Sequence, residues 1–402
     1  MEKKQIVIIE SSPTDTLAKI AKGLKKKGYE VIFISLVSDI ERDFIKESYD
    51  KTISFNAKFF KINISNFPEI FFHGLKNFSA IIKSLYEITK LKPYVIIGRA
   101  PPNWLCTIFA KYFKKYPFIY FPYDIRSFSY PSLKDALSNG VPKFEINSEK
   151  YCFENTDGII HKGDENELNI LNKTLLGDIN IACPTFYFFP YCLGEFAVPL
   201  DKTNKISLRQ KGIHLVYVGH VPDDSGWIEG LNNIINQGIY LHLYSRTNNI
   251  PDKEEKQRVM KVLKDSLKKK FLVLHDTVSQ KELSKEISKY DYGIYSYCIS
   301  GKKGYSNATG NKIPSYLEAG LPVIYPDYYL SAGKFLEDSG VGIKLSNFNK
   351  LKKILKKNNP SKFEKNILKT RDFLSIENQV GLLENFFKQV ICIKHNLWKK
   401  KD

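Results

Sequence analysis

The sequence predicts an α/β protein made of two tandem Rossmann-like domains, each a parallel sheet covered by helices. Short, continuous runs of β-branched residues alternate with amphipathic helical stretches, as expected for strands buried on both faces. This series occurs twice, on either side of a Pro-containing polar stretch around 190–212. The length of 402 residues also favours two or three domains. We therefore assign residues 1–195 to an N-terminal domain, 206–375 to a C-terminal domain and 376–402 to a final helix with a basic tail.

The first domain opens with a βαβ unit. A buried strand at 6–9 precedes a helix that ends at Gly28, and a second buried strand follows at 30–35. The loop at 10–16 lacks the GxGxxG fingerprint of dinucleotide-binding folds, which argues against an NAD-dependent enzyme. The same pattern predicts further strands at 92–99, 118–126 and 157–162, with helices at 105–115 and 148–155.

The second domain repeats the alternation. Its expected strands are 214–219, 240–245, 271–275, 292–296 and 322–325, and its expected helices are about 226–236, 253–269, 280–289 and 312–319. A final helix at roughly 378–396 is apolar on one face, so we expect that face to pack against another part of the protein.

Composition and charge limit the classes of function. The apolar content of 43% argues against long disordered stretches. A net charge of +18 and a pI near 9.3 favour an anionic partner, although scattered lysines that only solvate the surface would give the same totals. No RNA- or DNA-binding module is evident, so we expect no nucleic acid partner. The sequence shows neither a signal peptide nor an apolar run long enough to cross a membrane, which predicts a cytoplasmic protein.

No pattern typical of a metal site is present. The six cysteines form no CxxC pair and the seven histidines form no HExxH motif. No DxD-type pair at a strand end suggests a diphosphate-metal clamp, and Asp223–Asp224 is the nearest approach to one. We therefore expect neither a cofactor nor an essential metal. His73, His214, His242 and His395 lie in no motif and are interpreted as structural.

Ligands of open parallel sheets bind at the carboxyl ends of the strands. In the second domain those ends carry polar side chains or glycine at five positions, which are Gly219, His220, Ser245, Arg246 and Thr277.

The segment 307–324 is the most informative part of the chain. Gly310, Asn311 and Lys312 open a helix there, and free backbone N–H groups together with the Lys312 charge would attract phosphate. Gly320 then ends the helix before the next strand.

This segment, Asn-Ala-Thr-Gly-Asn-Lys-Ile-Pro-Ser-Tyr-Leu-Glu-Ala-Gly-Leu-Pro-Val-Ile, resembles the Asn-Lys-x-x-Glu-Tyr-Leu-Ala-Ala-Gly-x-Pro-Val-Ile signature of nucleotide-sugar-dependent glycosyltransferases of the GT-B fold, group 1 or family 4-like. The resemblance spans essentially the whole chain. It implies a C-terminal helix that crosses back to the first domain, a nucleotide sugar bound by the second domain and an acceptor bound by the first. The implied reaction is sugar transfer to a glycan or lipid-linked acceptor in polysaccharide or glycoconjugate synthesis.

The chain departs from the family pattern where donor recognition is concerned. Ser315 stands where the family commonly has a ribose-binding Glu, and Asn307 stands where many retaining members have another. Ser315 can give ribose one hydrogen bond, but not the stronger charge-assisted contact. Glu318 is expected on a different helical face, and part of the diphosphate-binding role is assigned to Arg246 and Lys312. These departures keep two alternatives open, a sugar-nucleotide epimerase of the same fold and a non-catalytic binding or scaffold protein.

The first domain places five candidate residues at expected strand ends, which are Glu10, Arg99, Asp124, Arg126 and His161. Asp124 or His161 would be the catalytic base that an inverting transferase needs. The alternatives are an ion pair of Asp124 with Arg126 or Arg99, and a capping or core role for His161. Glu10, Arg99 and Arg126 are assigned to the acceptor side, Arg99 being well placed for an anionic group.

Two basic, aromatic stretches suggest peripheral contact with an anionic membrane. They are residues 109–116 and 396–401, and such surfaces rest on acidic lipid in other proteins. A lipid-linked acceptor would fit this interpretation, with the protein at the inner face of the membrane. A solvated helix face is the alternative.

Overall fold

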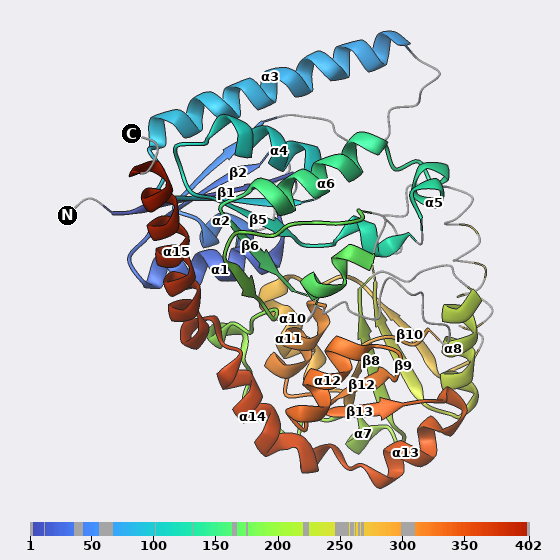
Figure 1. Cartoon of the computed structure of the whole chain (residues 1–402). Coiled ribbons are helices and arrows are strands. Elements are labelled where there is room, and N and C mark those ends of the chain that lie inside the picture. Colours follow the sequence, from blue (N-terminus) through green and yellow to red (C-terminus); the bar gives the residue numbers. More distant parts are fainter. Residues whose placement is uncertain are drawn as a thin grey trace. The chain divides into compact units, whose positions relative to one another are not determined.

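The structure is a computed structural model. It describes residues 3–11, 13–35, 43–55, 67–100, 102–130, 132–162, 167–173, 176–219, 225–245, 257, 261, 263, 266, 269–298 and 310–399, with backbone only at 67–77, 129, 170, 172–173, 225 and 397–399. The chain divides into two compact units (Figure 1). Unit 1 comprises the chain up to Phe189 together with the segment from Gln379 onward, and unit 2 comprises Pro190–Asn378.

Unit 1 is built on a seven-stranded sheet whose printed pairs are all parallel. Its strand order is β3-β2-β1-β4-β5-β6-β7, with bounds β1 Gln5–Glu10, β2 Glu30–Ser35, β3 Lys51–Ser54, β4 Val95–Ala100, β5 Phe118–Pro122, β6 Gly158–His161 and β7 Thr185–Tyr187. The order reverses between β1 and β4, because β1 leads outward to β2 on one side and β4 leads outward to β5 on the other. The carboxyl ends of β1 and β4 therefore form the topological switch point, where open parallel sheets bind ligands.

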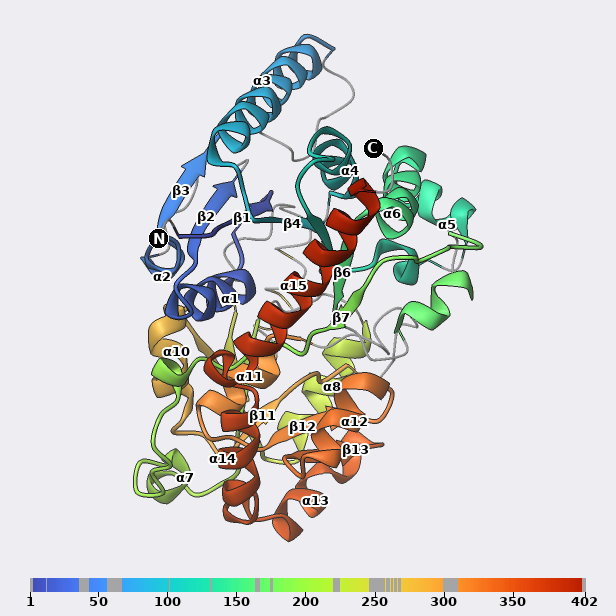
Figure 2. The same cartoon turned by 60° about the vertical axis from the view of Figure 1, so that its left-hand side comes forward.

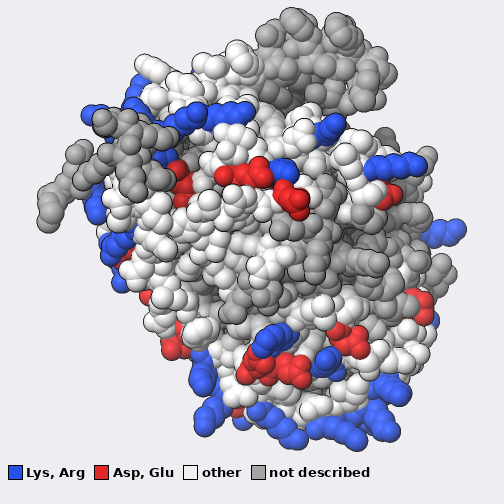
Figure 3. Space-filling view, viewed as in Figure 1, with Lys and Arg blue, Asp and Glu red and all other residues white. Residues whose placement is uncertain are grey.

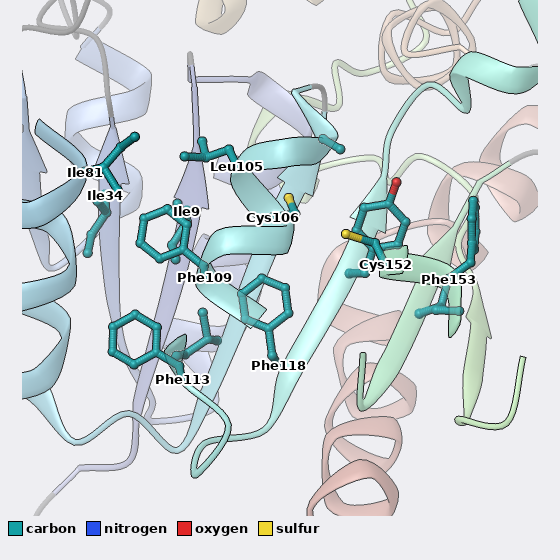
Figure 4. Packing of buried hydrophobic residues seen from close by; sticks show 14 of the residues in the cluster. Ile9, Ile34, Ile81, Leu105, Cys106, Phe109, Phe113, Phe118, Cys152 and Phe153 are labelled. Atoms are coloured by element: carbon teal, nitrogen blue, oxygen red, sulfur yellow. The ribbon is translucent and has the colours of Figure 1, made fainter. Parts of the chain in front are cut away.

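The helices of unit 1 cover this sheet. They are α1 Asp15–Lys26, α2 Asp43–Ser48, α3 Phe67–Leu91, α4 Asn103–Tyr112, α5 Leu133–Ser138 and α6 Lys143–Asn155, with short 3-10 helices at Arg126–Ser129 and Glu167–Lys173. Ile9, Ile34 and Ile81 belong to the same buried cluster as the apolar side of α4 (Figure 4). Phe109 and Phe113 are also in this core, so two aromatics of the 109–116 stretch are not available to a membrane.

Two elements of unit 1 differ from the sequence expectation. The strand expected to reach residue 126 ends at Pro122, and the chain turns into the 3-10 helix that starts at Arg126. The buried Glu149 carboxylate holds this turn, because it accepts hydrogen bonds from the Arg126 N–H (2.7 Å) and the Ser127 N–H (3.0 Å). The 25-residue helix α3 was not anticipated at all.

The last helix, α15 (Ile376–Lys399), returns to unit 1 and runs beside β6 and β7 (Figure 2). A β-carbon at Gly158 of β6 would lie 2.7 Å from Val390, so this glycine permits the close approach of the helix. The rings of Phe186 and Phe386 lie 5.4 Å apart. The expectation that the C-terminal helix packs by its apolar face and crosses back to the first domain is confirmed.

Unit 2 contains a six-stranded parallel sheet of order β10-β9-β8-β11-β12-β13. Its strands are β8 His214–Val218, β9 Tyr240–Tyr244, β10 Leu272–His275, β11 Tyr292–Ile294, β12 Val323–Pro326 and β13 Gly342–Leu345. Its helices are α7 Ile206–Arg209, α8 Ser225–Asn236, α10 Gln280–Ile287, α11 Lys312–Glu318, α12 Leu330–Asp338, α13 Leu351–Lys357 and α14 Glu364–Phe373, with 3-10 helices at Gly194–Phe196, Phe348–Lys350 and Pro360–Phe363. The helix expected at 253–269 lies mostly outside the described residues. The switch point of this sheet lies between β8 and β11.

Residues 190–195, which the sequence assigns to the first domain, make their contacts in unit 2. Cys192 N–H donates to the Leu374 carbonyl (3.0 Å), and Leu193 N–H donates to the buried Glu318 carboxylate (2.7 Å). These bonds anchor the start of unit 2.

Basic side chains of unit 2 gather around one helix on the face shown in Figure 3. Lys and Arg side chains gather where α13 lies (Figure 3), and α13 itself has the sequence Leu-Lys-Lys-Ile-Leu-Lys-Lys. Leu351 and Leu355 of this helix are buried, so its lysines form the solvated face of an amphipathic helix. Within the described part of the chain, no helix is both long and apolar enough to span a membrane.

Candidate functional site

The switch point of unit 1 holds a buried ion pair. Glu10 is the last residue of β1 and Arg99 lies near the end of β4, and their side chains meet with Arg99 Nη1 2.8 Å from Glu10 Oε1. Glu10 is fully buried and Arg99 is 8% exposed. The Arg99 Nε has no hydrogen-bond partner among the described residues. A guanidinium that keeps a buried N–H without a partner can still bind a ligand oxygen.

Tyr123 joins this pair to two further charged groups. The Arg99 guanidinium lies 4.4 Å from the centre of the Tyr123 ring, and Lys162 Nζ lies 3.5 Å from it. Lys162 also pairs with Asp124 at 3.1 Å, but the Asp124 side chain is 71% exposed. We call these five residues the Arg99 cluster. The structure thus brings three candidates together, Glu10, Arg99 and Asp124, and adds Tyr123 and Lys162, which sequence reasoning missed. The cluster offers two cations around one aromatic ring.

His161 lies on the other face of the sheet from Arg99. Gly98 pairs with Tyr120, and Tyr120 pairs with Ile159, so those three residues share a face. Side chains alternate along a strand, which puts Arg99 on one face and His161 on the other. His161 Nδ1 lies 3.2 Å from Glu167 Oε2, and a carboxylate only accepts hydrogen bonds. In the neutral ring the hydrogen is therefore on Nδ1 and Nε2 is the basic nitrogen.

Arg126 is positioned by its backbone. Its N–H is held by Glu149, as described above, and among the described residues no hydrogen bond or ion pair joins its side chain to Glu10 or Arg99. Burial raises the pKa of Glu149 to about 7, against the opposing effect of the two backbone hydrogen bonds. A second carboxylate one turn earlier, Glu145, accepts the N–H groups of Asn103 and Trp104 at the start of α4. The i, i+4 spacing of these two glutamates on α6 is the one sequence signal for their shared role.

Tyr316 links the two strands on either side of the switch point of unit 2. Its hydroxyl accepts from the Val218 N–H of β8 (3.2 Å) and donates to the Ile294 carbonyl of β11 (2.9 Å). A β-carbon at Gly293 would lie 2.4 Å from the Tyr316 ring, so only glycine leaves room for this side chain. One hydroxyl therefore makes a hydrogen bond to a backbone group of each strand at the point where the two strands separate.

Lys312 lies at this switch point. Its ammonium is 4.9 Å from the centre of the Tyr217 ring and 5.8 Å from that of Tyr295. Burial lowers the pKa of Lys312 to about 8. No carboxylate of the described residues pairs with this ammonium, although the segments 220–224 and 299–309 lie outside them. A buried ammonium without an anion is energetically costly and well suited to bind one.

Gly219 follows β8 and borders this lysine. Its φ of +130° is disfavoured for other residues, and a β-carbon there would lie 3.1 Å from Lys312 Cε. Gly310 is similarly close to Tyr295, whose hydroxyl oxygen would lie 2.9 Å from an added β-carbon. Both glycines thus leave space beside the Tyr295–Lys312 contact.

The other second-domain candidates have different surroundings. Ser315 is buried and its hydroxyl donates back to the Asn311 carbonyl at 3.2 Å. The Ser245 hydroxyl is buried without a partner among the described residues, and so is that of Tyr297, which sequence reasoning missed. Thr277 and Asn311 are exposed. Because α11 has only seven residues, its dipole is short, and the charge of Lys312 is the stronger attraction for phosphate.

Several predicted residues lie outside the described part of the chain. They are His220, Arg246, Asp223–Asp224 and Asn307. Glu318, which the sequence placed on a different helical face, is buried. Its carboxylate stabilises the fold by accepting hydrogen bonds from the Leu193 N–H and the Ser284 hydroxyl. Among the described residues, no group of three or more His, Cys, Asp or Glu side chains is arranged to hold a metal ion.

Comparison with known proteins identifies similar structures but no sequence family. No protein-family model matches the chain, and no curated protein matches its sequence. Sucrose-phosphate synthase from Thermosynechococcus elongatus is similar in structure, with a TM-score of 0.63, 15% identity and 99% of each chain covered. A glycosyltransferase from Rickettsia africae has a TM-score of 0.63 and 12% identity over 97% of this chain and 99% of its own. HepE from Anabaena, solved with UDP-glucose, has a TM-score of 0.59 and 10% identity over 98% of each chain.

These likenesses cover the whole chain at low identity, and they establish its fold. Two parallel α/β units and a C-terminal helix that returns to the first unit are the architecture that the 307–324 signature implies. The chain has the GT-B fold of nucleotide-sugar-dependent glycosyltransferases.

Proposed function

We propose that this protein is a glycosyltransferase that transfers a sugar from a nucleotide donor to a glycan or lipid-linked acceptor. The observation that carries the proposal is Lys312, a partly buried ammonium at the switch point of unit 2 with no carboxylate partner among the described residues. It lies in the segment that resembles the donor-binding signature of the family, within the fold to which that signature belongs.

The donor is assigned to unit 2. Lys312 would bind the diphosphate, and the phosphates would supply the negative charge that this partly buried ammonium lacks. Arg246 is proposed to share this role. The buried hydroxyls of Ser245 and Tyr297 have no partner among the described residues, and we assign them as candidate contacts for the donor. HepE is solved with UDP-glucose, so uridine nucleotides are the first to test.

The acceptor is assigned to unit 1, at the Arg99 cluster. In the transfer, the acceptor hydroxyl oxygen forms a bond to the sugar's anomeric carbon. The bond from that carbon to the phosphate oxygen breaks, and the diphosphate leaves with the electron pair. The hydroxyl proton passes to a base in an inverting reaction. We assign the base to Asp124, which belongs to the Arg99 cluster and has an exposed carboxylate, with His161, buried on the opposite face of the sheet, as the alternative.

We also propose that α3 rests on an anionic membrane. One face of this helix is buried at Ala80, Ile81 and Leu85. Another face is exposed and carries large apolar side chains at i, i+4 spacing, namely Phe78, Ile82 and Tyr86. Large exposed apolar stripes favour contact with a membrane or partner. Lys83, Lys90 and Lys111 are exposed on α3 and α4, and Figure 3 shows uncharged surface over the described half of α3 with basic side chains beside it. This charge complements acidic lipid.

The membrane proposal is tested by flotation with vesicles. Wild-type protein should float with vesicles containing acidic lipid and much less with neutral ones, and added salt should weaken the binding. Replacing Phe78 and Tyr86 by Ser should lower binding by about tenfold or more, since each buried aromatic contributes about 1.5–3 kcal/mol. Phe373→Ser, which changes a similarly exposed Phe in unit 2, is the matched control. Equal binding by all three proteins would contradict the proposal.

The glycosyltransferase proposal is tested first by donor binding. Thermal shift and calorimetry with UDP, GDP, ADP and CMP and their sugar conjugates should identify one nucleotide, and a ligand at about 100 times its Kd should add about 2.7 kcal/mol of stability. The bound sugar nucleotide should be stable until an acceptor is supplied. Turnover without acceptor would indicate an epimerase instead.

A non-catalytic binding protein is the second candidate. The absence of a ribose-binding carboxylate favours it, because the Ser315 hydroxyl already donates within its own helix. This candidate predicts no stabilisation by any nucleotide, together with a protein partner that co-purifies. Transfer of sugar by the isolated chain would eliminate it.

A further inference from the structure

Three histidines from three neighbouring strands of unit 2 form a continuous hydrogen-bonded row. His214 begins β8, His242 lies within β9 and His275 ends β10. His214 Nδ1 lies 3.0 Å from His242 Nε2, and His242 Nδ1 lies 2.9 Å from His275 Nε2. We call these residues the histidine row. Sequence reasoning treated the first two as unrelated structural residues.

One backbone carbonyl fixes the tautomer of the whole row. His214 Nε2 lies 3.0 Å from the Gln210 carbonyl oxygen, which only accepts, so this nitrogen carries a hydrogen. In the neutral ring His214 Nδ1 is then an acceptor, and His242 must donate to it from Nε2. By the same step, His275 donates from Nε2 to His242 Nδ1. All three neutral rings are Nε2–H tautomers, and His275 Nδ1 is left as a free acceptor among the described residues.

Aromatic rings enclose the row. Tyr240 stacks on His214 at 4.5 Å and Tyr244 stacks on His275 at 4.4 Å between ring centres. The Tyr290 hydroxyl lies 3.3 Å from His275 Nε2 and 2.8 Å from the Tyr244 hydroxyl, which in turn donates to Glu286 (2.7 Å). The row is therefore shielded from water along most of its length.

The charged groups around the row are nearly balanced. Glu286 and Lys289 pair with each other beside His275 and Tyr290, and Asp276 follows His275. At the other end, Asp291 accepts the His214 N–H (2.8 Å), while the Lys205 ammonium donates to the Ser288 and Tyr290 carbonyls. None of the hydrogen bonds or ion pairs of the described residues joins a carboxylate to a ring nitrogen of the row. No adjacent anion thus favours full protonation of its three rings.

We propose that the histidine row is a single proton-binding site that holds one proton at a time. A proton bound at His275 Nδ1 leaves one hydrogen in each N···N contact, so no hydrogen bond is broken. The charge can then move inward: the His275 Nε2 hydrogen passes to His242 Nδ1, and the His242 Nε2 hydrogen passes to His214 Nδ1. A second proton would put two hydrogens between one pair of nitrogens and force the rings apart. The strand that then separates is β10, at the edge of the sheet.

Burial supports a low occupancy of this site at neutral pH. Desolvation, together with the neighbouring histidines, lowers the pKa of His242 to about 3, and desolvation lowers that of His275 as well. In the unfolded chain, histidines titrate near pH 6.5. Below that pH the unfolded state binds more protons than the native row, so the stability of unit 2 should fall as pH falls.

Nitrogen NMR of histidine side chains tests the proposal on the wild-type protein. At about pH 7.5, the three rings of the row should all be Nε2–H tautomers, whereas the exposed His395 should average between tautomers. On acidification, the three rings should change together with one midpoint, as one shared proton enters. An Nδ1–H tautomer at His242, or three independent midpoints, would overturn the proposal.

A variant provides the second measurement. His242→Gln can still accept from His275 and donate to His214, but it cannot carry a proton. As pH falls below about 6, the unfolding constants of both proteins should rise. That of the wild type should rise up to tenfold more per pH unit, because its unfolding takes up one more proton than the unfolding of His242→Gln. His395→Gln is the control and should follow the wild type. Identical pH profiles for wild type and His242→Gln would refute the one-proton site, and if His242→Gln does not fold, the NMR tautomers decide.

Discussion

Gly219 borders Lys312 at the switch point of unit 2, so closely that a β-carbon on Gly219 would lie 3.1 Å from Lys312 Cε. Gly219 has a φ of +130°, and its N–H donates to the Tyr244 carbonyl at 2.9 Å. The glycine is thus fixed to β9 while leaving space for the lysine. Backbone conformation and side-chain position are linked at this point, because a β-carbon on Gly219 would require the Lys312 side chain to shift by a few tenths of an ångström.

Gly219→Ala should therefore weaken nucleotide binding and destabilise unit 2. The strained backbone costs on the order of 1–2 kcal/mol. The added methyl also crowds Lys312 Cε, which must shift by a few tenths of an ångström. Calorimetry with the nucleotide and urea unfolding measure the two effects. Gly381→Ala, in α15 with nothing within 4 Å of the new atom, should be neutral or slightly stabilising. Unchanged affinity in Gly219→Ala would remove this glycine from the donor site.

Lys312→Met should change affinity and stability in opposite directions. Loss of the charged hydrogen bond should weaken nucleotide binding by about 1.5–3 kcal/mol, or roughly 10- to 150-fold. The free protein should gain on the order of 1–3 kcal/mol, since each pKa unit is worth about 1.4 kcal/mol and burial lowers the pKa of Lys312 from 10.5 to about 8. Lys334→Met, at an exposed lysine of the same unit, should change neither quantity. A variant that is less stable without ligand would contradict this assignment.

The lowered pKa of Lys312 determines the direction in which stability and nucleotide affinity change with pH. Its native pKa is below its unfolded value, so the unfolded state binds more protons between about pH 8 and 10.5. The stability advantage of Lys312→Met over the wild type should therefore be full at pH 7 and shrink as pH rises through this window. Nucleotide affinity of the wild type should fall over the same range as the ammonium loses its proton. Lys312→Met should show no such fall.

Local patterns in the sequence were sufficient to predict the fold and the position of Lys312 at the start of α11. The Gly-Asn-Lys start of α11 and the glycine that ends it are consecutive in the chain, so short-range chemistry specifies them. The histidine row depends instead on the register of three parallel strands, since His214, His242 and His275 are far apart in sequence. Tyr123 and Lys162 were missed for the same reason, because their shared contact joins the ends of β5 and β6. Glu149 accepts hydrogen bonds from backbone N–H groups of another segment, and its only signal in the sequence is the i, i+4 spacing from Glu145.

Glu318→Ala should destabilise unit 2 without changing donor affinity. The buried Glu318 carboxylate accepts the Leu193 N–H at 2.7 Å, and its removal would leave that N–H buried without a partner. Such a loss costs about 1–3 kcal/mol, which urea unfolding can measure. Glu318→Gln keeps an accepting oxygen and should lose less. Glu337→Ala, at an exposed position of α12, serves as the control. A large loss of nucleotide affinity in folded Glu318→Gln would instead place this residue in the donor site.

Substitution of Asp124 and His161 separates the two candidate bases. Asp124 is exposed within the Arg99 cluster, whereas His161 is buried on the opposite face of the sheet with its Nδ1 held by Glu167. Asp124→Asn should therefore lower kcat by about 10²- to 10⁴-fold, the range for a general base, with donor affinity unchanged. His161→Gln should leave kcat within a few-fold of wild type, because the acceptor binds on the other face of the sheet. The reverse order, with His161→Gln the most impaired and Asp124→Asn active, would assign the proton to the imidazole and make the Asp124–Lys162 pair structural.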